Sequence, residues 1–368
     1  LPPRMLPAAF VVRPAFPLNQ SGKVDRKALP KPNYSTAVLR AQHVAPRTDT
    51  EKQLAAIWST VLNVEDIGVH DNFFDIGGHS LTGIQLLTRV EQHFGKNIPL
   101  KDLFLAPTVA QMAALLSDGE RIVPEGSALL PLRTSGSRVP LICVHGDEAN
   151  VFLPKYLSQD QPFYGISHQG DDGEPILFTE VETIAAHYIE ELRRVLPEGP
   201  YQLCGYSFGG VVAFEMARQL AASGASVPMV VLLDTYAPKP FVEVMMSERK
   251  FHEPVKDVLL RGVISIFRAL GKPLPVQIRN FHIIDTYDRA IIRYKTNRYP
   301  GRVALIKTHG SPGPADMGWG ELVSGELLLR DCVGDHYSMI KEPHVQQLAA
   351  VMTEAMATVH EHPSIAVR

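Results

Sequence analysis

The sequence has few cysteines and no strong charge bias. Its 368 residues include 3 cysteines, and 36 Lys and Arg against 39 Asp and Glu give a formal net charge of −3. Cys143, Cys204 and Cys332 are an odd number without CxxC spacing, which argues against a disulfide framework and a zinc cluster. The basic residues form no long run that would neutralise nucleic-acid phosphates. We therefore expect no metal site, no nucleic-acid partner and a reducing, cytoplasmic location.

Long apolar runs are also missing. No stretch approaches the roughly 20 apolar residues that cross a bilayer. Residues 1–4 lack the basic and apolar blocks of a signal peptide, and the chain does not begin with Met. We therefore expect no membrane association and a segment of a longer protein. The 45% hydrophobic and 20% charged residues favour two or three globular domains.

Residues 48–117 show the pattern of a small helical bundle. Thr48 and Glu51 have the spacing of a capping box that opens a helix. Between the first two helical patterns runs Asp-Asn-Phe-Phe-Asp-Ile-Gly-Gly-His-Ser-Leu, whose glycines predict an exposed turn that delivers Ser80 to a helix start. Apolar residues recur at helical spacing in three stretches: 54–62, 84–94 and 109–116.

The remainder, residues 129–368, follows a linker at residues 118–128 and alternates strands with helices. Short apolar runs of this kind suit strands that are buried on both faces of a parallel sheet. The pattern predicts a doubly wound α/β domain. Its main apolar runs are residues 139–144, 201–204 and 228–233, and its clearest helical stretch is residues 211–222.

A nucleophile motif follows one of these strands. Gly-Tyr-Ser-Phe-Gly-Gly at residues 205–210 matches G-x-S-x-G between a strand and a helix. The glycines permit the tight turn that exposes Ser207, and the following helix aims N–H groups, including that of Phe208, at a developing oxyanion. Because a serine is a poor nucleophile unassisted, a base must follow.

In proteins with this nucleophile motif, the three catalytic residues follow one another along the chain in the order nucleophile, acid, histidine. Asp234 ends the next apolar run, and His336 lies in a glycine-containing loop after the apolar residues 327–329. Asp335 is a rival acid, but adjacent side chains in a loop seldom point at each other, so Asp234 is preferred. The candidate for the second oxyanion donor is a backbone N–H in the loop after the first strand, that of Asp147 or a neighbour.

Residues 71–81 resemble the signature of peptidyl carrier proteins, and the resemblance extends over residues 48–117. It implies that Ser80 carries a 4′-phosphopantetheine arm, transferred from coenzyme A by a separate phosphopantetheinyl transferase. An anionic phosphodiester is favoured at a helix N-terminus by free N–H groups and the helix dipole.

Residues 129–360 resemble the type I thioesterases of peptide and polyketide synthetases, which have the α/β-hydrolase fold. The stretches around Asp234 and His336 match the acid and histidine motifs of that family. The resemblance implies a helical lid at about residues 240–297. Most such enzymes have a proline shortly after the first-strand histidine, where this chain has Asp147 and Glu148.

The first segment is similar to the closing motif of adenylation domains. Residues 17–27 contain the matching Gly-Lys-Val-Asp-Arg, with Lys23 as the lysine of that motif. We expect residues 1–30 to be the end of such a domain and residues 31–47 a linker. We expect no adenylation by Lys23, because the ATP-binding part of that domain is absent from this sequence.

These resemblances imply the termination end of a nonribosomal peptide synthetase, working with upstream adenylation and condensation domains. Ser207, activated by His336 and Asp234, would attack a peptidyl or acyl thioester on the Ser80 arm. Hydrolysis, macrocyclisation or oligomerisation would then release the product.

Two other functions stay open. The chain could be a generic α/β-hydrolase esterase, because two features are shared across that fold: the tight turn that exposes the serine, called the nucleophile elbow, and the triad of serine, acid and histidine. It could also be a carrier and docking module with an inactive thioesterase. Reductive release would need a nucleotide-binding GxGxxG after a strand, and the sequence has none.

Overall fold

The computed structural model describes Pro17 and residues 43–78, 80–96, 98, 100–118, 127–146, 148–170, 176–248, 254–270, 274 and 276–357. By its internal contacts the chain divides into two compact units. The first comprises residues 1–97 and 106–119, and the second comprises residues 98–105 and 120–368. The segment that resembles the end of an adenylation domain, with Lys23, lies outside the described residues apart from Pro17.

The first unit contains the three helices that the periodicity predicts: α1 (Asp49–Leu62), α2 (Ser80–Phe94) and α4 (Val109–Asp118). The predicted capping box is confirmed, because Thr48 Oγ1 accepts the Glu51 N–H at 3.1 Å and Glu51 Oε2 accepts the Thr48 N–H at 3.0 Å. The backbone N–H groups of Thr48 and Arg47 lower the pKa of Glu51 to about 2. A short helix that the periodicity did not predict, α3 (Leu100–Leu105), is grouped by its contacts with the second unit.

The second unit is built on a seven-stranded sheet with the order β1-β3-β2-β4-β5-β6-β7. All neighbouring strands are parallel except β1 and β3, which pair antiparallel at one edge. This edge pair was not expected. The strands are β1 (Leu129–Arg133), β2 (Leu141–Val144), β3 (Phe163–Ile166), β4 (Gln202–Tyr206), β5 (Val230–Leu233), β6 (Val303–Thr308) and β7 (Leu327–Cys332).

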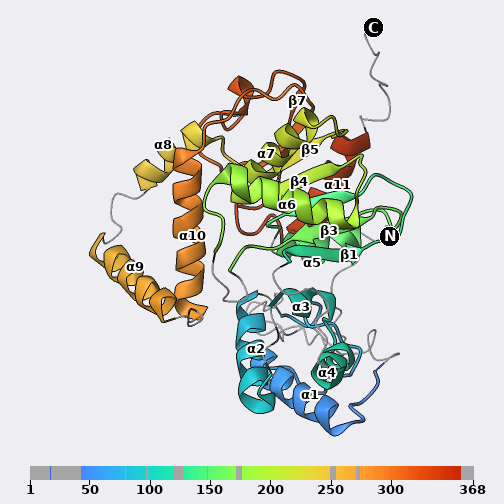
Figure 1. Ribbon diagram of the computed structural model, residues 1–368. Helices are drawn as coiled ribbons and strands as arrows, with labels where there is room; N and C mark the ends of the chain where they lie inside the picture. Colours follow the sequence, from blue (N-terminus) through green and yellow to red (C-terminus); the bar gives the residue numbers. More distant parts are fainter. Residues whose placement is uncertain are drawn as a thin grey trace. The chain divides into compact units, whose positions relative to one another are not determined.

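Helices cover both faces of this sheet, as the predicted doubly wound α/β domain requires (Figure 1). Two of them, α6 (Val181–Val195) and α7 (Phe208–Ala222), pack against each other. The other pair, α5 (Glu148–Tyr156) and α11 (His344–Ala357), also pack together. A 3-10 helix, η5 (Trp319–Glu321), lies between β6 and β7.

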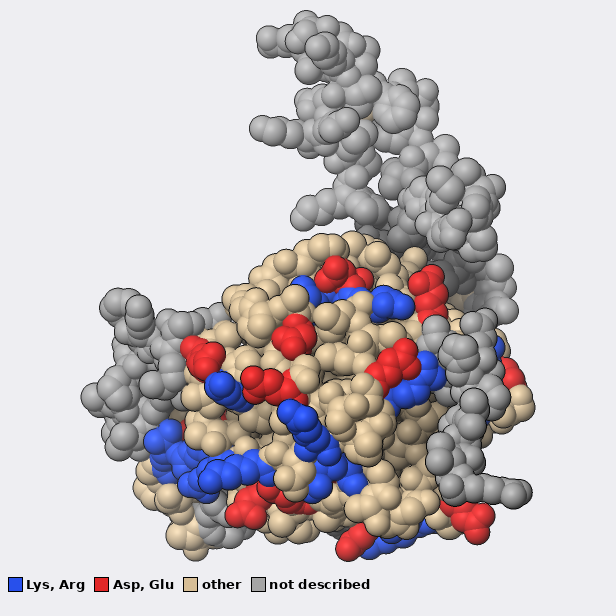
Figure 2. Space-filling model, turned by 90° about the horizontal axis from the view of Figure 1, so that it is seen from above, with Lys and Arg blue, Asp and Glu red and all other residues tan. Residues whose placement is uncertain are grey.

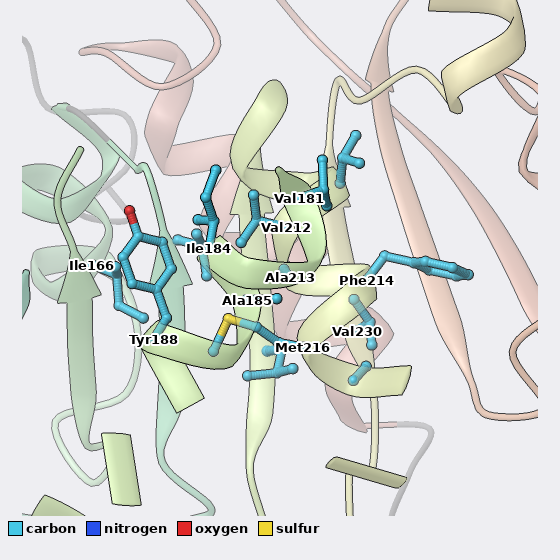
Figure 3. Packing of buried hydrophobic residues seen from close by; sticks show 14 of the residues in the cluster. Ile166, Val181, Ile184, Ala185, Tyr188, Val212, Ala213, Phe214, Met216 and Val230 are labelled. Atoms are coloured by element: carbon cyan, nitrogen blue, oxygen red, sulfur yellow. The ribbon is translucent and has the colours of Figure 1, made fainter. Parts of the chain in front are cut away.

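The apolar core lies between α6, α7 and the sheet. Strands β2, β4 and β5 are buried at every position, which explains why they appear in the sequence as short continuous apolar runs. Figure 3 shows side chains of this core gathered from two helices and the sheet: Ile184, Ala185 and Tyr188 of α6; Val212, Ala213 and Met216 of α7; and Ile166 and Val230 of the sheet.

Three helices are inserted between β5 and β6: α8 (Pro238–Glu248), α9 (Pro254–Ala269) and α10 (Val276–Arg293). Asp285 of α10 binds Arg261 of α9 at 2.7 Å and Arg289 of its own helix at 2.8 Å. Tyr294, which follows α10, donates a hydrogen bond to Glu215 of α7 at 2.6 Å. An ion pair therefore joins α9 to α10 within the insertion, and a hydrogen bond joins the end of the insertion to α7.

The surface in Figure 2 carries both signs of charge among a majority of uncharged residues. Acidic side chains lie between the basic ones on this face. Within the described part of the chain, no helix is both long and apolar enough to cross a membrane.

The close packing of α7 makes Gly209→Ala strongly destabilising. A Cβ at residue 209 would lie 2.2 Å from the carbonyl oxygen of Val144 and 2.8 Å from His145 Cβ. Backbone cannot move aside as a flexible side chain can, so we expect a loss of about 3 kcal/mol in the free energy of unfolding. The measurement is urea unfolding followed by Trp319 fluorescence in a Trp58→Phe background. The chain has 2 tryptophans, so removal of Trp58 from the first unit leaves Trp319 to report on the second unit alone.

Gly262→Ala in α9 is the matched control. No atom lies within 4 Å of a Cβ at that position, so the change should be neutral or stabilise by up to about 1 kcal/mol through helix propensity. Equal effects of the two substitutions would contradict the packing argument.

Candidate active site

Ser207 occupies a sharp turn between β4 and α7. Its backbone has φ 54° and ψ −122°, a positive φ that is rare for a residue other than glycine. Its N–H donates to Leu233 O at 3.0 Å, and its carbonyl accepts the Gly210 N–H at 3.0 Å. The strand, turn and helix thus have the geometry that the G-x-S-x-G pattern predicts.

The motif glycines are required by contacts rather than by flexibility. A Cβ at Gly205 would lie 2.2 Å from the carbonyl oxygen of Gly209, and one at Gly210 would lie 2.1 Å from Thr235 Oγ1. The first turn of α7 therefore lies directly against the end of β4 and the residues that follow β5.

His336 and Asp234 are brought together from separate loops. His336 Nδ1 lies 2.7 Å from Asp234 Oδ2. Asp234 directly follows β5 and is 3% exposed, whereas the His336 side chain is 34% exposed. A buried carboxylate bound to one ring nitrogen leaves the other nitrogen available to exchange a proton.

The second oxygen of Asp234 has two donors. Oδ1 accepts the Thr308 N–H at 3.0 Å and the Ser311 hydroxyl at 2.6 Å. Burial raises the pKa of Asp234, but the hydrogen bonds from His336, Ser311 and Thr308 outweigh it and lower that pKa below its ordinary value. Sequence reasoning missed Ser311, because nothing in its local sequence indicates a partner 77 positions away.

Asp335, the rival acid, binds its own loop. Its Oδ1 accepts the N–H groups of Tyr337 at 3.0 Å and Ser338 at 2.9 Å. These and the other hydrogen bonds to Ser338 lower the pKa of Asp335. The carboxylate that contacts His336 is therefore Asp234.

Tyr206 connects the elbow to the histidine loop. Its hydroxyl donates to His336 O at 2.6 Å, and its ring stacks on the His336 ring with 5.0 Å between centroids. Within the described residues no hydrogen bond links the Ser207 hydroxyl to the His336 ring. The structure thus places His336 against Tyr206, the residue before Ser207. In the part of the chain that the structure describes, the Asp234–His336 pair and the turn that carries Ser207 are not joined to each other by a hydrogen bond between His336 and the serine hydroxyl.

The candidate oxyanion donors lie at the start of α7. Phe208 is its first residue, so its N–H has no acceptor one turn back in the helix. The turn after β2 lies against this helix start, because Val144 O and His145 Cβ approach Gly209. Asp147, the candidate second donor, lies outside the described residues.

An aromatic group adjoins this helix start and was not recognised in the sequence. Tyr287 of α10 stacks on Phe208 with 4.2 Å between centroids and on His145 with 5.2 Å. His145 is buried, and burial together with nearby His168 holds its pKa well below the ordinary value, so its ring is neutral. In the described part of the chain, no three His, Cys, Asp or Glu side chains are grouped to hold a metal ion.

In the first unit, Ser80 is the first residue of α2, as the turn before it predicts. The turn is fixed by its own sequence: Asn72 Oδ1 accepts the Phe74 N–H at 3.0 Å, and Gly78 donates to Phe73 O at 2.8 Å. A Cβ at Gly78 would lie 2.3 Å from the fully buried Phe73 ring. The glycine therefore lets the turn pass over the core just before the serine.

Comparison with family models matches both units. The model described as thioesterase domain matches residues 140–355, which is more than half of the chain. The chain belongs to the thioesterase family. A second model, described as phosphopantetheine attachment site, matches residues 52–116. The thioesterase is thus preceded by a carrier domain whose prosthetic group is phosphopantetheine.

Relatives of this carrier–thioesterase chain are peptide synthetases. It is 39% identical over 395 aligned positions to chondramide synthase cmdD of Chondromyces crocatus, and 41% identical over 320 to a dimodular nonribosomal peptide synthase of Bacillus subtilis. These alignments cover 94% and 84% of this chain. Among solved structures, a holo four-domain nonribosomal peptide synthetase bound to AMP and glycine is similar over 95% of this chain and 29% of its own, with 26% identity and a TM-score of 0.52.

The chain spans only a small part of these relatives. It covers 10% of chondramide synthase and 13% of the dimodular synthase. The family matches show a carrier domain and a thioesterase domain within this chain.

The hydrogen bonds around Asp234 predict a pH-dependent effect of Ser311→Ala. Because the folded pKa of Asp234 is depressed, its stabilising contribution is present above its unfolded pKa of about 3.9 and is lost as the pH falls through the folded value. We expect the variant to lose about 2 kcal/mol in the free energy of unfolding at pH 7. Urea titrations should show a smaller difference at pH 3.

Ser324→Ala is the control, because Ser324 donates to the neutral carbonyl of Tyr299. Its effect should not change with pH. A Ser311→Ala effect of the same size at both pH values would show that the ionised Asp234 is not the partner that matters.

Proposed function

We propose that this chain is a carrier–thioesterase termination module that releases an acyl or peptidyl group from a nonribosomal peptide synthetase. Ser207, Asp234 and His336 are its catalytic triad, and Ser80 bears the phosphopantetheine arm. The main support is the 2.7 Å contact between His336 and Asp234 beside a serine elbow, in a chain that also contains a carrier domain.

Ser80 suits the attachment of the arm. It begins the 15-residue helix α2 after a turn fixed by Asn72, Phe73 and Gly78. Free N–H groups and the positive end of the helix dipole favour the phosphodiester there. When attached, the arm supplies a terminal thiol that holds the acyl group as a thioester.

His336 acts as the general base of acylation. It takes the proton of the Ser207 hydroxyl as the serine oxygen attacks the thioester carbonyl, and Asp234 holds the imidazole through Nδ1 and stabilises the imidazolium. Collapse of the tetrahedral intermediate breaks the carbon–sulfur bond, and His336 returns the proton to the carrier thiolate. The products are an acyl ester on Ser207 and a free carrier thiol.

The oxyanion of that intermediate is stabilised by backbone donors. The N–H of Phe208 at the start of α7 is one, and a second comes from the turn after β2, at Asp147 or a neighbour. The Phe208 N–H lies at the N-terminus of α7, where the helix dipole favours negative charge. Tyr287, stacked on Phe208, places the inserted helix α10 next to this position, so the insertion can act as a lid over the acyl group.

Release of the Ser207 ester requires a second nucleophile. His336 deprotonates water to give the free acid, or an amine or hydroxyl of the acyl chain to give a ring. A second carrier-bound chain would give an oligomer. The partners of the module are a phosphopantetheinyl transferase with coenzyme A and the adenylation and condensation domains upstream. We place it in the cytoplasm, consistent with its three free, buried cysteines.

Intact-mass analysis tests the assignment of the two serines. The chain is loaded by a phosphopantetheinyl transferase with a panel of acyl-coenzyme A donors, and its mass is followed over time. We expect the parent to lose at least one acyl group, Ser207→Ala to retain it at least 1,000-fold longer, the order of effect of removing a triad nucleophile, and Ser80→Ala never to load.

Ser117→Ala and Ser223→Ala are the matched controls. Ser117 lies in α4 of the carrier, and Ser223 is the C-cap of α7, at the far end of the helix that Ser207 precedes. Both variants should load and discharge like the parent. Discharge from Ser207→Ala at the parent rate would leave a carrier with an inactive thioesterase, and release that does not require Ser80 loading would favour a generic esterase.

A further inference from the structure

Tyr206 contacts His336 in two different ways. It is the last residue of β4, directly before Ser207, and only 6% exposed. Its hydroxyl donates to the backbone carbonyl of His336 at 2.6 Å. Its ring faces the imidazole with 5.0 Å between centroids and 26° between planes, which is a stacked arrangement.

These contacts complement the one from Asp234. His336 lies in the segment between β7 and α11, outside any helix or strand. Asp234 holds the imidazole at Nδ1, whereas the Tyr206 hydroxyl holds the backbone of the same residue. Because Tyr206 belongs to the central strand that ends at the nucleophile, its hydroxyl fixes the distance between the histidine loop and the elbow.

The stacked ring also affects the charge of the imidazole. When His336 takes the proton of Ser207, it becomes a cation whose ring lies against the face of Tyr206. An aromatic face attracts a cation, and the attraction is stronger where the ring is shielded from water. Tyr206 is buried, whereas Tyr337, whose ring also touches His336, is 74% exposed and meets it edge-on at 83°.

We propose that Tyr206 is a positioning residue for His336: its hydroxyl sets the place of the base, and its ring stabilises the imidazolium formed during acyl transfer. This inference rests on the proposed role of His336 as the base.

Other groups around His336 are accounted for separately. Burial raises the pKa of the Cys332 thiol to about 11, so it stays neutral, and Asp335 is bound to the N–H groups of Tyr337 and Ser338. Among the described residues, the titratable and charged groups that contact or neighbour His336 include Asp234 after β5, Tyr206 of β4, Tyr337 and Asp335 of its own loop, Cys332 at the end of β7, and His344 of α11 near Asp335.

Two substitutions separate the two roles. Tyr206→Phe removes the hydroxyl and keeps the ring, whereas Tyr206→Leu removes both. Turnover of an acyl N-acetylcysteamine thioester by the phosphopantetheinylated chain is measured from pH 5 to pH 9. Rates are expressed per Ser207 that reacts to completion with a fluorophosphonate, so that misfolded protein does not contribute.

We expect Tyr206→Phe to lower kcat about tenfold with KM unchanged, because the base is displaced while substrate binding is not. The acidic midpoint of its pH–rate profile should match that of the parent. For Tyr206→Leu the midpoint should fall by about half a pH unit, since the positive ring loses a stabilising aromatic face.

Tyr201→Phe is the matched control. Tyr201 directly precedes the same strand at its opposite end, is 1% exposed and donates to the backbone carbonyl of Leu196 at 2.7 Å. This variant loses an equivalent buried hydrogen bond far from His336, so it should lose stability but keep the parent kcat and pH profile.

The outcomes are distinguishable. If Tyr206→Phe keeps the kcat of Tyr201→Phe, or Tyr206→Leu keeps the parent midpoint, Tyr206 is a core residue and the inference is wrong. For Ser207→Ala and His336→Ala, which cannot be counted with the fluorophosphonate, rates are expressed per mole of chain. If both turn over at the parent rate, the proposed function itself fails. Inactive triad variants together with an unaffected Tyr206→Phe would overturn this inference alone.

Discussion

The first turn of α7 lies so close to the ends of β2 and β4 and the residues after β5 that no side chain fits between them. Gly205, Gly209 and Gly210 each face an atom at 2.1 or 2.2 Å from the position of a missing Cβ. This close approach places the N–H groups of the helix start next to the turn that follows β2. It also puts Ser207 beside Leu233, the residue before Asp234, through the 3.0 Å hydrogen bond between them. The candidate chemistry depends on this contact between backbones.

Most of this arrangement is predictable where the interacting residues are close to one another in the sequence. The capping box at Thr48, the turn before Ser80 and the elbow at Ser207 each follow from residues within a few positions, and the structure shows all three local geometries. The buried strands were recognised because both of their faces are apolar. The edge strand β1 was not, because Leu129–Arg133 has a mixed burial pattern and contains Pro131, as an edge strand tolerates. Strand β3 was missed although it is buried at every position, because Gly165 interrupts the apolar run of its four residues.

Partners that are distant in the chain were predictable only in part. The order of nucleophile, acid and histidine pointed to Asp234 and His336 without any geometry. No such rule exists for Ser311, which reaches Asp234 only because the loop after β6 passes over the end of β5. Tyr206 was visible inside the motif, but its partner is a backbone carbonyl 130 positions away. Contacts to backbone atoms leave no signature in a single sequence, because every residue has a carbonyl.

Three adjacent strands are each followed by a residue of positive φ, and this shared ending explains how the residues of the candidate site are kept in position. The residues directly after β2, β4 and β5 are His145, Ser207 and Asp234, with φ of 50°, 54° and 44°. Non-glycine residues held in such sparsely populated backbone conformations cost on the order of 1–3 kcal/mol each. Each of the three residues also donates its N–H to the neighbouring strand, to Ile166, Leu233 and Ile306 respectively, at 2.8 to 3.0 Å. The ladder therefore continues one residue beyond each strand and holds the strained residue in place, after which the chain turns away. The candidate functional side chains at this edge are thus positioned by the rigid sheet. His336, which comes from a loop, is the member of the proposed triad that needs additional anchors from Asp234 and Tyr206.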